Sequence, residues 1–221
     1  LGDNGGPLLM KILTENVEQR KNIHVHYDTR TLCLIADENG DVHGVVVRID
    51  MKERFVRARK GVVLCAGGFI MNKEMLQKYA PKLLRGNIPI GNPGDTGTGI
   101  QMGISVGGAA INMHEGFMTI PFYPPGNMTF GIFVNAMGQR FINEDAYHGR
   151  VGNFAIQQRG DRLYMVVAAE DYGNFDRKPF FNGDIVGTGE TAEELEQELG
   201  FPPNSLAHTI NFYSEHAAKG D

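Results

Sequence analysis

The sequence lacks the features that define several common protein classes. Its 26 acidic and 21 basic residues are interspersed and give a net charge of −5, with no basic stripe that would suit nucleic acid. No apolar run approaches membrane-spanning length, and no signal-peptide pattern is present. The Gly-x-Gly-x-x-Gly turn that opens a dinucleotide-binding βαβ unit is also absent. We therefore expect neither a nucleic-acid partner nor a membrane span.

Cysteine is scarce too, because only Cys33 and Cys65 occur in 221 residues. Both lie in apolar, strand-like runs, which favours buried free thiols over a disulfide or a metal site. The sequence thus predicts no metal centre and a protein of the reducing cytoplasm. What the chain does have is 42% hydrophobic residues, enough for the core of one large domain or two small ones.

The central segment of the sequence is Lys60 to Phe69 (KGVVLCAGGF), a short apolar run followed by two glycines. Residues 62–64 do not alternate with polar ones, which predicts a strand buried on both faces. Gly67 and Gly68 carry no Cβ, so the backbone there can turn sharply and approach a flat or phosphorylated ligand. A tight turn without any ligand is the simpler interpretation of these ten residues alone.

Periodicity and turn signals predict mixed helices and strands. The sharpest signals are the N-cap Asn72, the Asn39-Gly40 hairpin turn and the capping box that begins at Thr191. The expected helices cover residues 8–17, 72–80, 98–106, 151–158, 191–200 and 206–217. The expected strands cover residues 23–27, 31–36, 42–49, 55–58, 131–135, 140–142 and 163–169. The strands before residue 60 follow one another closely, which predicts an antiparallel meander.

The densest group of proton-active side chains lies between residues 143 and 150. Its members are Glu144, Asp145, Tyr147, His148 and Arg150. Such a group can supply an acid or a base to a reaction. A polar loop in which an Asp or Asn caps the following helix explains the same residues.

Three motifs, in this order, resemble the flavoprotein family that contains fumarate reductase, succinate dehydrogenase and the 3-ketosteroid dehydrogenases. Residues 63–69 are similar to its VLATGGF segment, and residues 94–102 (GDTGTGIQM) and 133–144 (FVNAMGQRFINE) follow. The resemblance covers nearly the whole chain and implies a combined α/β and α+β fold. Residues 1–112 would be the C-terminal part of a three-layer FAD-binding domain with an antiparallel β-meander, and residues 113–221 an α+β capping and catalytic domain.

The resemblance also implies FAD as the cofactor. It places Thr31 near the adenine, and the other expected flavin contacts are Ala66, Gly67, Gly68, Phe69, Asp95, Thr96, Gly97 and Gly99. Asp95 could instead simply cap the helix that begins nearby. Family members carry the phosphate-binding turn upstream and another flavin segment downstream of the matching region. We therefore expect an internal fragment of a longer flavoprotein, which by itself is inactive.

The family places its substrate and proton donor in the second half. The implied substrate pocket is Met118, Thr119, Phe122 and Tyr123, and the implied catalytic residues are Glu144, Tyr147, His148 and Arg150. In fumarate reductases an arginine four residues after the glutamate acts as the acid, and His148 holds that position here. In ketosteroid dehydrogenases a tyrosine lies at about this place, and Tyr147 is one residue earlier.

Two departures from the family indicate the substrate class. The His-Pro-Thr and Thr-Glu-x-x-Arg segments that grip a dicarboxylate in fumarate reductases are missing, and residues 119–121 (TIP) replace the first. The preferred hypothesis is therefore dehydrogenation of an apolar ketone such as a 3-ketosteroid, with Tyr147 as acid or base. The alternatives are a reductase of an unsaturated carboxylic acid, and a folded remnant with neither flavin nor activity. The electron acceptor and the oligomeric state stay open.

Overall fold

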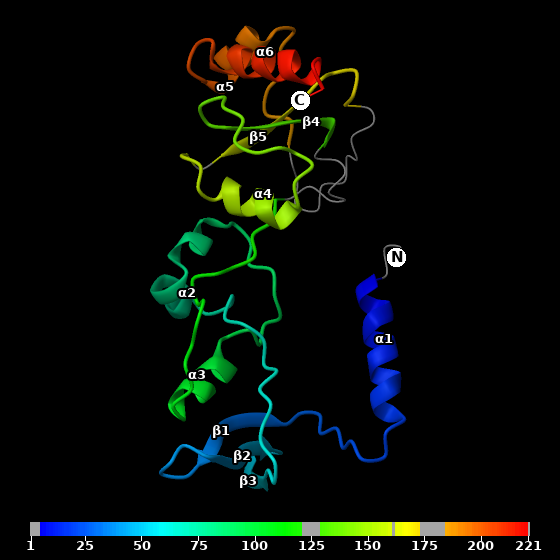
Figure 1. The fold of residues 1–221 in the computed structure, drawn as a ribbon, viewed down its shortest axis with the longest axis vertical. Coiled ribbons are helices and arrows are strands. Elements are labelled where there is room, and N and C mark those ends of the chain that lie inside the picture. The colour runs from blue at the N-terminus through cyan, green and yellow to red at the C-terminus, as the bar shows by residue number, and fades with distance from the viewer. Residues whose placement is uncertain (1–4, 121–128, 161, 173–183, 221) are drawn as a thin grey trace. The chain divides into compact units, whose positions relative to one another are not determined.

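The structure is a computed structural model that describes residues 5–120, 129–160, 162–172 and 184–220. Within these ranges, helices are mixed with two small antiparallel sheets, as Figure 1 shows. None of the helices in these ranges combines the length and the apolar character that crossing a bilayer requires. The α+β character expected from the sequence is confirmed.

The chain divides into two compact units. The first comprises Leu1–Ala66 and Thr98–Ala110, and the second comprises Gly67–Gly97 and Ile111–Asp221. The segment Gly67–Gly97 thus groups with the C-terminal part of the chain. The functional boundary expected after residue 112 stays a prediction.

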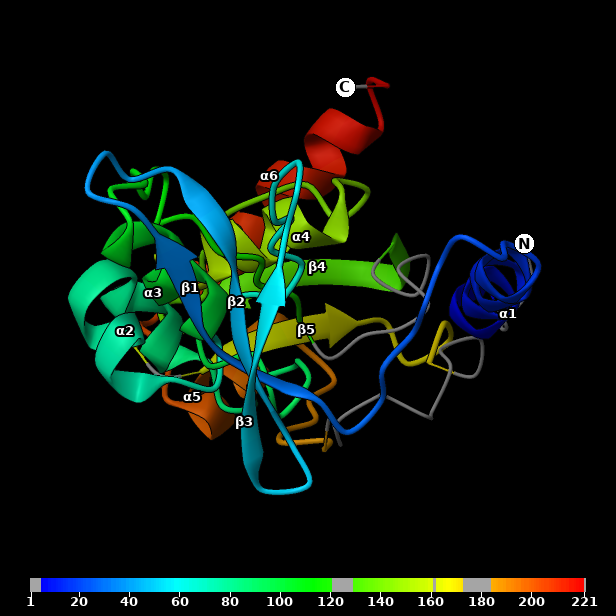
Figure 2. The same cartoon turned by 90° about the horizontal axis from the view of Figure 1, so that it is seen from below.

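A three-stranded antiparallel sheet forms the centre of the first unit. Its strands, β1 (Arg30–Ala36), β2 (Val42–Ile49) and β3 (Lys52–Arg57), lie in the order β1-β2-β3, as Figure 2 shows. Asp37 holds the first turn, because its Oδ1 accepts the N–H groups of Asn39 (2.9 Å) and Asp41 (3.0 Å). The predicted meander and its Asn-Gly turn are confirmed.

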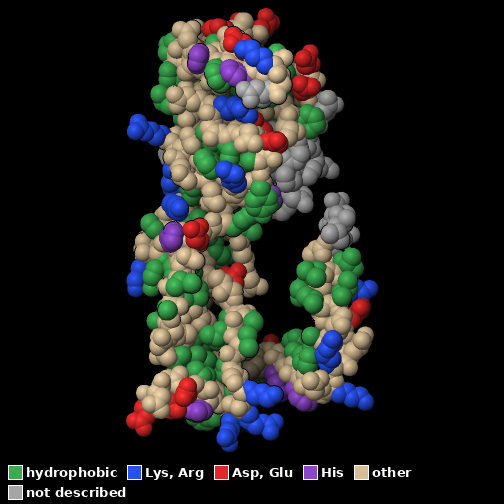
Figure 3. All heavy atoms as spheres, viewed as in Figure 1, with side chains coloured by type: hydrophobic (Ala, Val, Ile, Leu, Met, Phe, Trp, Pro, Cys, Tyr) green, Lys and Arg blue, Asp and Glu red, His purple; other side chains and the backbone are tan. Residues whose placement is uncertain are grey.

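Two predicted helices of the first unit are also confirmed. The N-terminal one, α1 (Gly5–Glu18), buries none of its residues, and its apolar side chains lie on the surface, as Figure 3 shows in green. The other, α3 (Thr98–Ser105), packs against β1 and ends just before Gly107. Only α3 therefore contributes to the packing of the sheet.

Two predicted strands of the first unit are wrong. Residues 23–27 and 62–64 pair with no strand in the part of the chain that the structure describes. Val63 keeps 86% of its surface exposed and Leu64 keeps 40%. An apolar run becomes a buried strand only where neighbouring strands bond its backbone N–H and C=O groups. No described residues do so here.

The prediction of buried thiols is wrong as well. Cys33 and Cys65 are free, as expected, but both are exposed. The pairing of β1 with β2 shifts register between Thr31 and Cys33, which breaks the alternation that would point Cys33 inward. Cys65 follows the unpaired run 62–64 and shares its exposure.

In the second unit, α2 (Lys73–Tyr79) begins at the predicted cap. The Oδ1 atom of Asn72 accepts the N–H of Met75 at 3.1 Å. The helix ends at Ala80, and the short 3-10 helix Pro81–Arg85 follows. A proline disfavours helical geometry at the residue before it, and Pro81 therefore explains why α2 stops before Ala80.

The core of the second unit surrounds an antiparallel strand pair, β4 (Gly131–Asn135) and β5 (Leu163–Val167). Two helices, α5 (Ala192–Leu199) and α6 (Ser205–Ala217), contribute to one hydrophobic cluster, and α4 (His148–Ala155) contributes to another. The first cluster is Ile132, Val134, Phe201 and Leu206, and the second is Phe133 and Val151. Alternate residues of β4 therefore face different clusters.

The return strand expected at residues 140–142 is wrong, because it shrinks to a single bridge between Val134 and Arg140. The partner of β4 is β5 instead. The N–H of Phe133 donates to Oε1 of Glu144 at 2.9 Å. A side chain thus occupies a donor that a third strand would need.

The start of α4 also differs from the prediction. The helix begins three residues early, at His148, and its N-cap is Tyr147, whose side chain makes no capping bond. The expected Asp or Asn cap is therefore wrong. Asp145 accepts instead from the side-chain amide of Asn143.

A buried glutamate, which the sequence did not reveal, joins α5 to the start of α6. Glu196 is 3% exposed and accepts the N–H groups of Leu206 (2.7 Å), Ala207 (2.9 Å) and Asn204 (2.8 Å). The bond from Ala207, together with the other two, holds the pKa of Glu196 below its ordinary value. Glu196 thus satisfies the first amides of α6 in place of a local cap.

Candidate active site

Two glycine-rich loops of the second unit are bonded to each other. They are residues 67–69 and residues 95–97, which the sequence predicts at a flavin. The N–H of Gly97 donates to the carbonyl of Gly68 (2.8 Å), and the N–H of Met71 donates to that of Asp95 (3.0 Å). The side-chain amide of Asn72 adds a bond to the carbonyl of Thr96 (2.9 Å). The structure therefore brings these predicted residues together as one surface.

Gly67 has to be glycine for two reasons. Its φ is +72°, which L side chains rarely adopt, and a Cβ there would overlap Oδ1 of Asp95. The other carboxylate oxygen, Oδ2, accepts the N–H of Asn92 at 2.8 Å. Asp95 thus braces the two loops.

The exposed edge of these loops fits a bound anion or planar ring. Gly67 and Gly68 are exposed, and their N–H groups donate to no acceptor in the described part of the chain. A Cβ on Gly68 would meet nothing within 4 Å. Free donors beside a backbone without side chains are what the phosphate or ring of a flavin nucleotide requires.

The remaining predicted flavin contacts lie in several places. In the first unit, Thr31 is on β1, and a Cβ on Gly99 would come within 2.9 Å of the Cβ of Ala66. In the second unit, Phe69 packs edge-on against Tyr79 of α2, with ring centroids 6.2 Å apart. The role of each of these residues stays a prediction.

An aromatic cluster gathers the residues predicted for proton transfer. The ring of Tyr147 lies 4.5 Å from that of His148 and 6.3 Å from that of Phe117, and the Phe117 and His148 rings are 5.6 Å apart. Tyr147 is 66% exposed. Its hydroxyl-bearing ring therefore stands at the surface with an apolar wall beside it.

Two glycines of α4 allow the predicted substrate segment to lie against the helix. A Cβ on Gly149 would overlap the ring of Phe117, and one on Gly152 would overlap the carbonyl of Met118. Met118 and Thr119 are half-buried at this contact. The structure thus places Met118 and Thr119 against Gly152 of α4, and their role in a pocket stays a prediction. Phe122 and Tyr123, also predicted there, lie outside the described residues.

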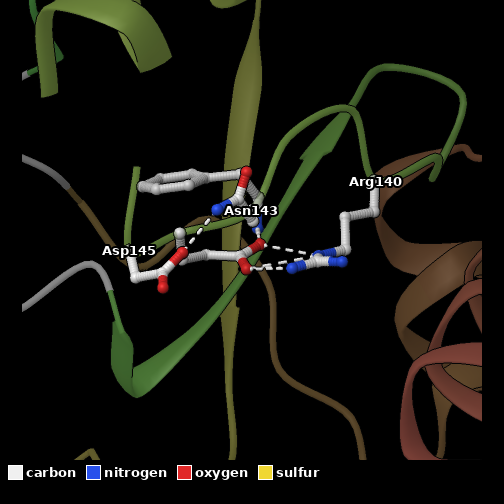
Figure 4. Close-up of polar contacts among 5 residues, drawn as sticks. Arg140, Asn143 and Asp145 are labelled. Atoms are coloured by element: carbon white, nitrogen blue, oxygen red, sulfur yellow. Dashed lines mark hydrogen bonds and ion pairs between the residues drawn. The ribbon is translucent and has the colours of Figure 1, made fainter. Parts of the chain in front are cut away.

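Glu144, which is buried, forms an ion pair with Arg140, whose side chain is 32% exposed. Glu144 is 5% exposed, and Oε2 lies 2.6 Å from Nη2 of Arg140, while Nε of Arg140 reaches both carboxylate oxygens at 3.1 and 3.2 Å. The dashed lines in Figure 4 mark these contacts at Arg140. The bonds to Glu144 raise the pKa of Arg140 above its ordinary value. Both carboxylate oxygens of Glu144 therefore accept hydrogen bonds from groups of the protein itself.

Two arginines of the second unit use their guanidinium groups within the protein. Arg140 is paired with Glu144, and Arg85, which the sequence interpretation overlooked, donates to the carbonyls of Ile156, Gln158 and Gly160. Arg150 is exposed and lies 5.9 Å from the ring of Phe154. Among the described residues, no group of three or more His, Cys, Asp or Glu side chains is arranged to hold a metal ion.

Comparison with known families gives a match over almost the whole chain. A model of the FAD binding domain matches residues 2–221. The chain is 25% identical to a fumarate reductase (cytochrome) of Shewanella frigidimarina, over 99% of this chain and 40% of that protein. It is 28% identical to a 3-oxosteroid 1-dehydrogenase of Mycobacterium tuberculosis, over 91% of this chain and 42% of that protein. The chain thus spans about two fifths of the length of these relatives.

Solved structures show the same fold. A 3-ketosteroid-Δ4-(5α)-dehydrogenase from Rhodococcus jostii RHA1, in complex with 4-androstene-3,17-dione, is similar with a TM-score of 0.85 and 32% identity, covering 97% of this chain and 44% of that one. A flavocytochrome c3 fumarate reductase in its open conformation is similar in fold, with a TM-score of 0.61, 23% identity and coverage of 100% and 40%. These likenesses confirm the predicted fold class.

Proposed function

The chain belongs to the FAD-binding domain family, and we propose that the protein of which it forms part is an FAD-dependent oxidoreductase of carbon–carbon bonds. Its substrate in this proposal is an apolar ketone, with a 3-ketosteroid as the favoured class. Residues 1–112 would contribute to the cofactor domain and residues 113–221 to the capping domain over the substrate. The likeness to the ketosteroid dehydrogenase of Rhodococcus jostii, at 32% identity, supports this class.

The two bonded glycine loops are the part of the second unit that would hold the cofactor. The free N–H groups of Gly67 and Gly68 would bind flavin oxygens, and Asp95 would keep the two loops in register. Bound FAD supplies a hydride acceptor to the reaction. In the first unit, the residues that we expect to bind FAD are Thr31, Ala66 and Gly99.

Tyr147 is the group we assign to the proton. Removal of hydrogen from the bond next to the carbonyl takes a hydride from one carbon and a proton from its neighbour, and a double bond forms between them. Tyr147 would accept that proton on its phenolic oxygen, or donate it in the reverse direction. Tyrosine holds its proton at neutral pH, so it needs help from a neighbour, and His148 is the nearest titratable ring, at 4.5 Å.

One observation carries this choice of substrate: the ring of Tyr147 lies 6.3 Å from the apolar ring of Phe117, which itself packs at Gly149 of α4. Arg140 and Arg85 both use their guanidinium groups within the protein. A dicarboxylate would need counter-charges, whereas a ketone on an apolar ring system needs a wall and one proton-transfer group.

A second candidate function is reduction of an unsaturated carboxylic acid. Arg150 would then bind the carboxylate and His148 would donate the proton. The exposure of Arg150 and the similarity to a fumarate reductase favour this candidate. It differs from the first in its electron flow, since the substrate then accepts hydride from reduced flavin.

Substitution of Tyr147 by Phe in the full-length protein tests the assignment. We expect turnover of a 3-ketosteroid to fall about 10²-fold or more while the flavin absorption band is retained. Tyr27→Phe is the matched control, because Tyr27 is 76% exposed and lies on the first unit. Retained turnover in Tyr147→Phe would remove this residue from the mechanism, and a full-length protein without a flavin band would favour the inactive remnant.

A further inference from the structure

We infer that the Arg140–Glu144 ion pair is the positioning element for Tyr147, so that Glu144 acts on the reaction through the tyrosine and not by moving a proton itself. This inference rests on the proposed function. It also replaces the catalytic role first expected for Glu144 from the sequence.

The carboxylate of Glu144 is unsuited to direct contact with substrate. It is 5% exposed, and its two oxygens accept three N–H···O contacts from Arg140 and one from the backbone of Phe133. An acid or base has to reach the proton that it transfers. Glu144 instead has its acceptors directed into the protein.

The pair connects three parts of the second unit. Glu144 bonds to β4 through the N–H of Phe133 (2.9 Å), and Phe133 is 2% exposed in the cluster that includes Val151 of α4. The guanidinium carbon of Arg140 lies 4.9 Å from the ring centroid of Tyr213 on α6. The start of the loop that leads to Tyr147 is therefore attached to β4 and to α6.

The far end of the same short loop is attached to α4. The carbonyl of Tyr147 accepts the N–H groups of Arg150 (2.7 Å) and Val151 (3.1 Å). Between the two ends, the N–H of Ala146 donates to the carbonyl of Asn143 at 3.3 Å. Tyr147 lies three residues after Glu144, so a shift of the anchor moves the backbone of Tyr147.

Few of the described residues contact the ring of Tyr147. It is 66% exposed, and within the described part of the chain the rings beside it are those of Phe117 and His148. A side chain with so few neighbours takes its position from its backbone. Catalytic geometry tolerates small displacements poorly, so loosening the anchor reduces the proton-transfer rate.

A double-mutant cycle in the full-length holoenzyme tests the inference, with Glu144→Gln, Tyr147→Phe and the double variant. We expect Glu144→Gln to lower kcat about tenfold or more while KM changes less than about threefold. In the Tyr147→Phe background, the same change should cost nothing further. An equal loss of kcat in both backgrounds would overturn the inference, because Glu144 would then act independently of Tyr147.

Asp145→Asn is the matched control. It removes one carboxylate charge from the same loop, but Asp145 is exposed and accepts its side-chain hydrogen bond from Asn143, as Figure 4 shows. We expect its kcat to match the wild type. A loss as large as that of Glu144→Gln would show that loop charge, not the ion pair, matters, and would overturn the inference.

Arg140→Lys provides a second variant, should Glu144→Gln fail to fold. Lysine keeps the charge but lacks the planar fork that holds both carboxylate oxygens. We expect a smaller fall in kcat, about threefold to tenfold, which again disappears in the Tyr147→Phe background. A folded Arg140→Lys variant with unchanged kcat would contradict the inference.

A measurement without turnover separates this inference from the proposed function. The ring signals of Tyr147 in the tyrosine-labelled 221-residue chain should shift in Glu144→Gln and in Arg140→Lys, and stay in place in Asp145→Asn. Unchanged signals in a folded Glu144→Gln chain would overturn the anchoring. If Tyr147→Phe keeps its kcat, the proposed function fails, and the ring signals still decide whether the pair positions this residue.

Discussion

The two compact units differ in how many hydrophobic and acidic side chains they bury. Among the described residues of the first unit, the buried hydrophobic side chains are Val47 and Met102, and the acid that organises its hairpin, Asp37, is exposed. The second unit buries Glu144 and Glu196 together with two hydrophobic clusters. The first unit thus has few buried side chains, whereas the second buries two acids together with its hydrophobic clusters.

The largest effect on stability should come from the ion pair between buried Glu144 and Arg140 in the second unit. Glu144→Gln leaves the charge of Arg140 without its partner. We expect a loss of about 2–3 kcal/mol, below the roughly 3–5 kcal/mol of wholly buried pairs, because Arg140 keeps some solvent exposure. Urea unfolding measures the change, with Asp145→Asn expected within about 0.5 kcal/mol of wild type. Equal losses in the two variants would remove the distinction between buried and exposed acids.

A matched pair of valines compares the units directly. Val134 in β4 is 0% exposed, whereas Val63 in the first unit is 86% exposed. We expect Val134→Ala to cost roughly 2 kcal/mol, from lost burial and the cavity that remains, and Val63→Ala to cost less than about 0.5 kcal/mol. Thermal unfolding of the 221-residue chain checks both values. A large effect at Val63 would mean that the run 62–64 is buried after all.

Acid should destabilise the second unit through Glu196. The folded pKa of Glu196 lies below its ordinary value of 4.5, so its contribution to stability is complete above that pH and is lost as the pH falls through the folded value. We expect the unfolding free energy of Glu196→Gln to depend less on pH in this range. The amide oxygen can still accept from α6, so the loss at neutral pH should be modest. If the unfolding free energies of the wild type and of Glu196→Gln changed with pH in parallel, this role of Glu196 would be contradicted.

The smallest effect should come from the acid of the first unit. His43, at 2.8 Å, and the N–H groups of its own turn lower the pKa of Asp37 below its ordinary value. Asp37 stabilises only an exposed hairpin, so Asp37→Asn should alter the NMR signals of that turn and leave the unfolding midpoint nearly unchanged. If Asp37→Asn lost as much unfolding free energy as Glu196→Gln at the same pH, the exposed acid would matter as much as the buried one, which would contradict the comparison.

Local signals predicted much of this fold. The Asn39-Gly40 turn, the Asn72 cap and the Thr191 capping box all lie where the sequence placed them. Two strand errors share one cause: residues 62–64 and 140–142 needed strand partners, and the side chain of Glu144 accepts the N–H of Phe133 in the second case. A sequence shows the strand propensity of a run but not which groups will pair with it.

The site was predictable to a similar extent. The order of the motifs predicted the two glycine loops and the cluster at Tyr147. In the structure the two loops are hydrogen-bonded to each other, and the rings of Tyr147 and His148 are in contact. The partners of Glu144 and Glu196 were not predictable, because they lie on other elements. The spacing of Arg140 and Glu144 resembles a helical ion pair, but the segment is not helical, so that spacing carried no usable signal.

The most direct test of the proposed function is the flavin absorption of the full-length protein, recorded without oxygen as substrate is added. We predict that a saturated 3-ketosteroid bleaches the oxidised flavin band in the wild type, and that Tyr147→Phe retains the band but bleaches far more slowly. A band that the ketosteroid leaves unchanged, together with reduced flavin that an unsaturated acid reoxidises, would contradict the account and support the second candidate.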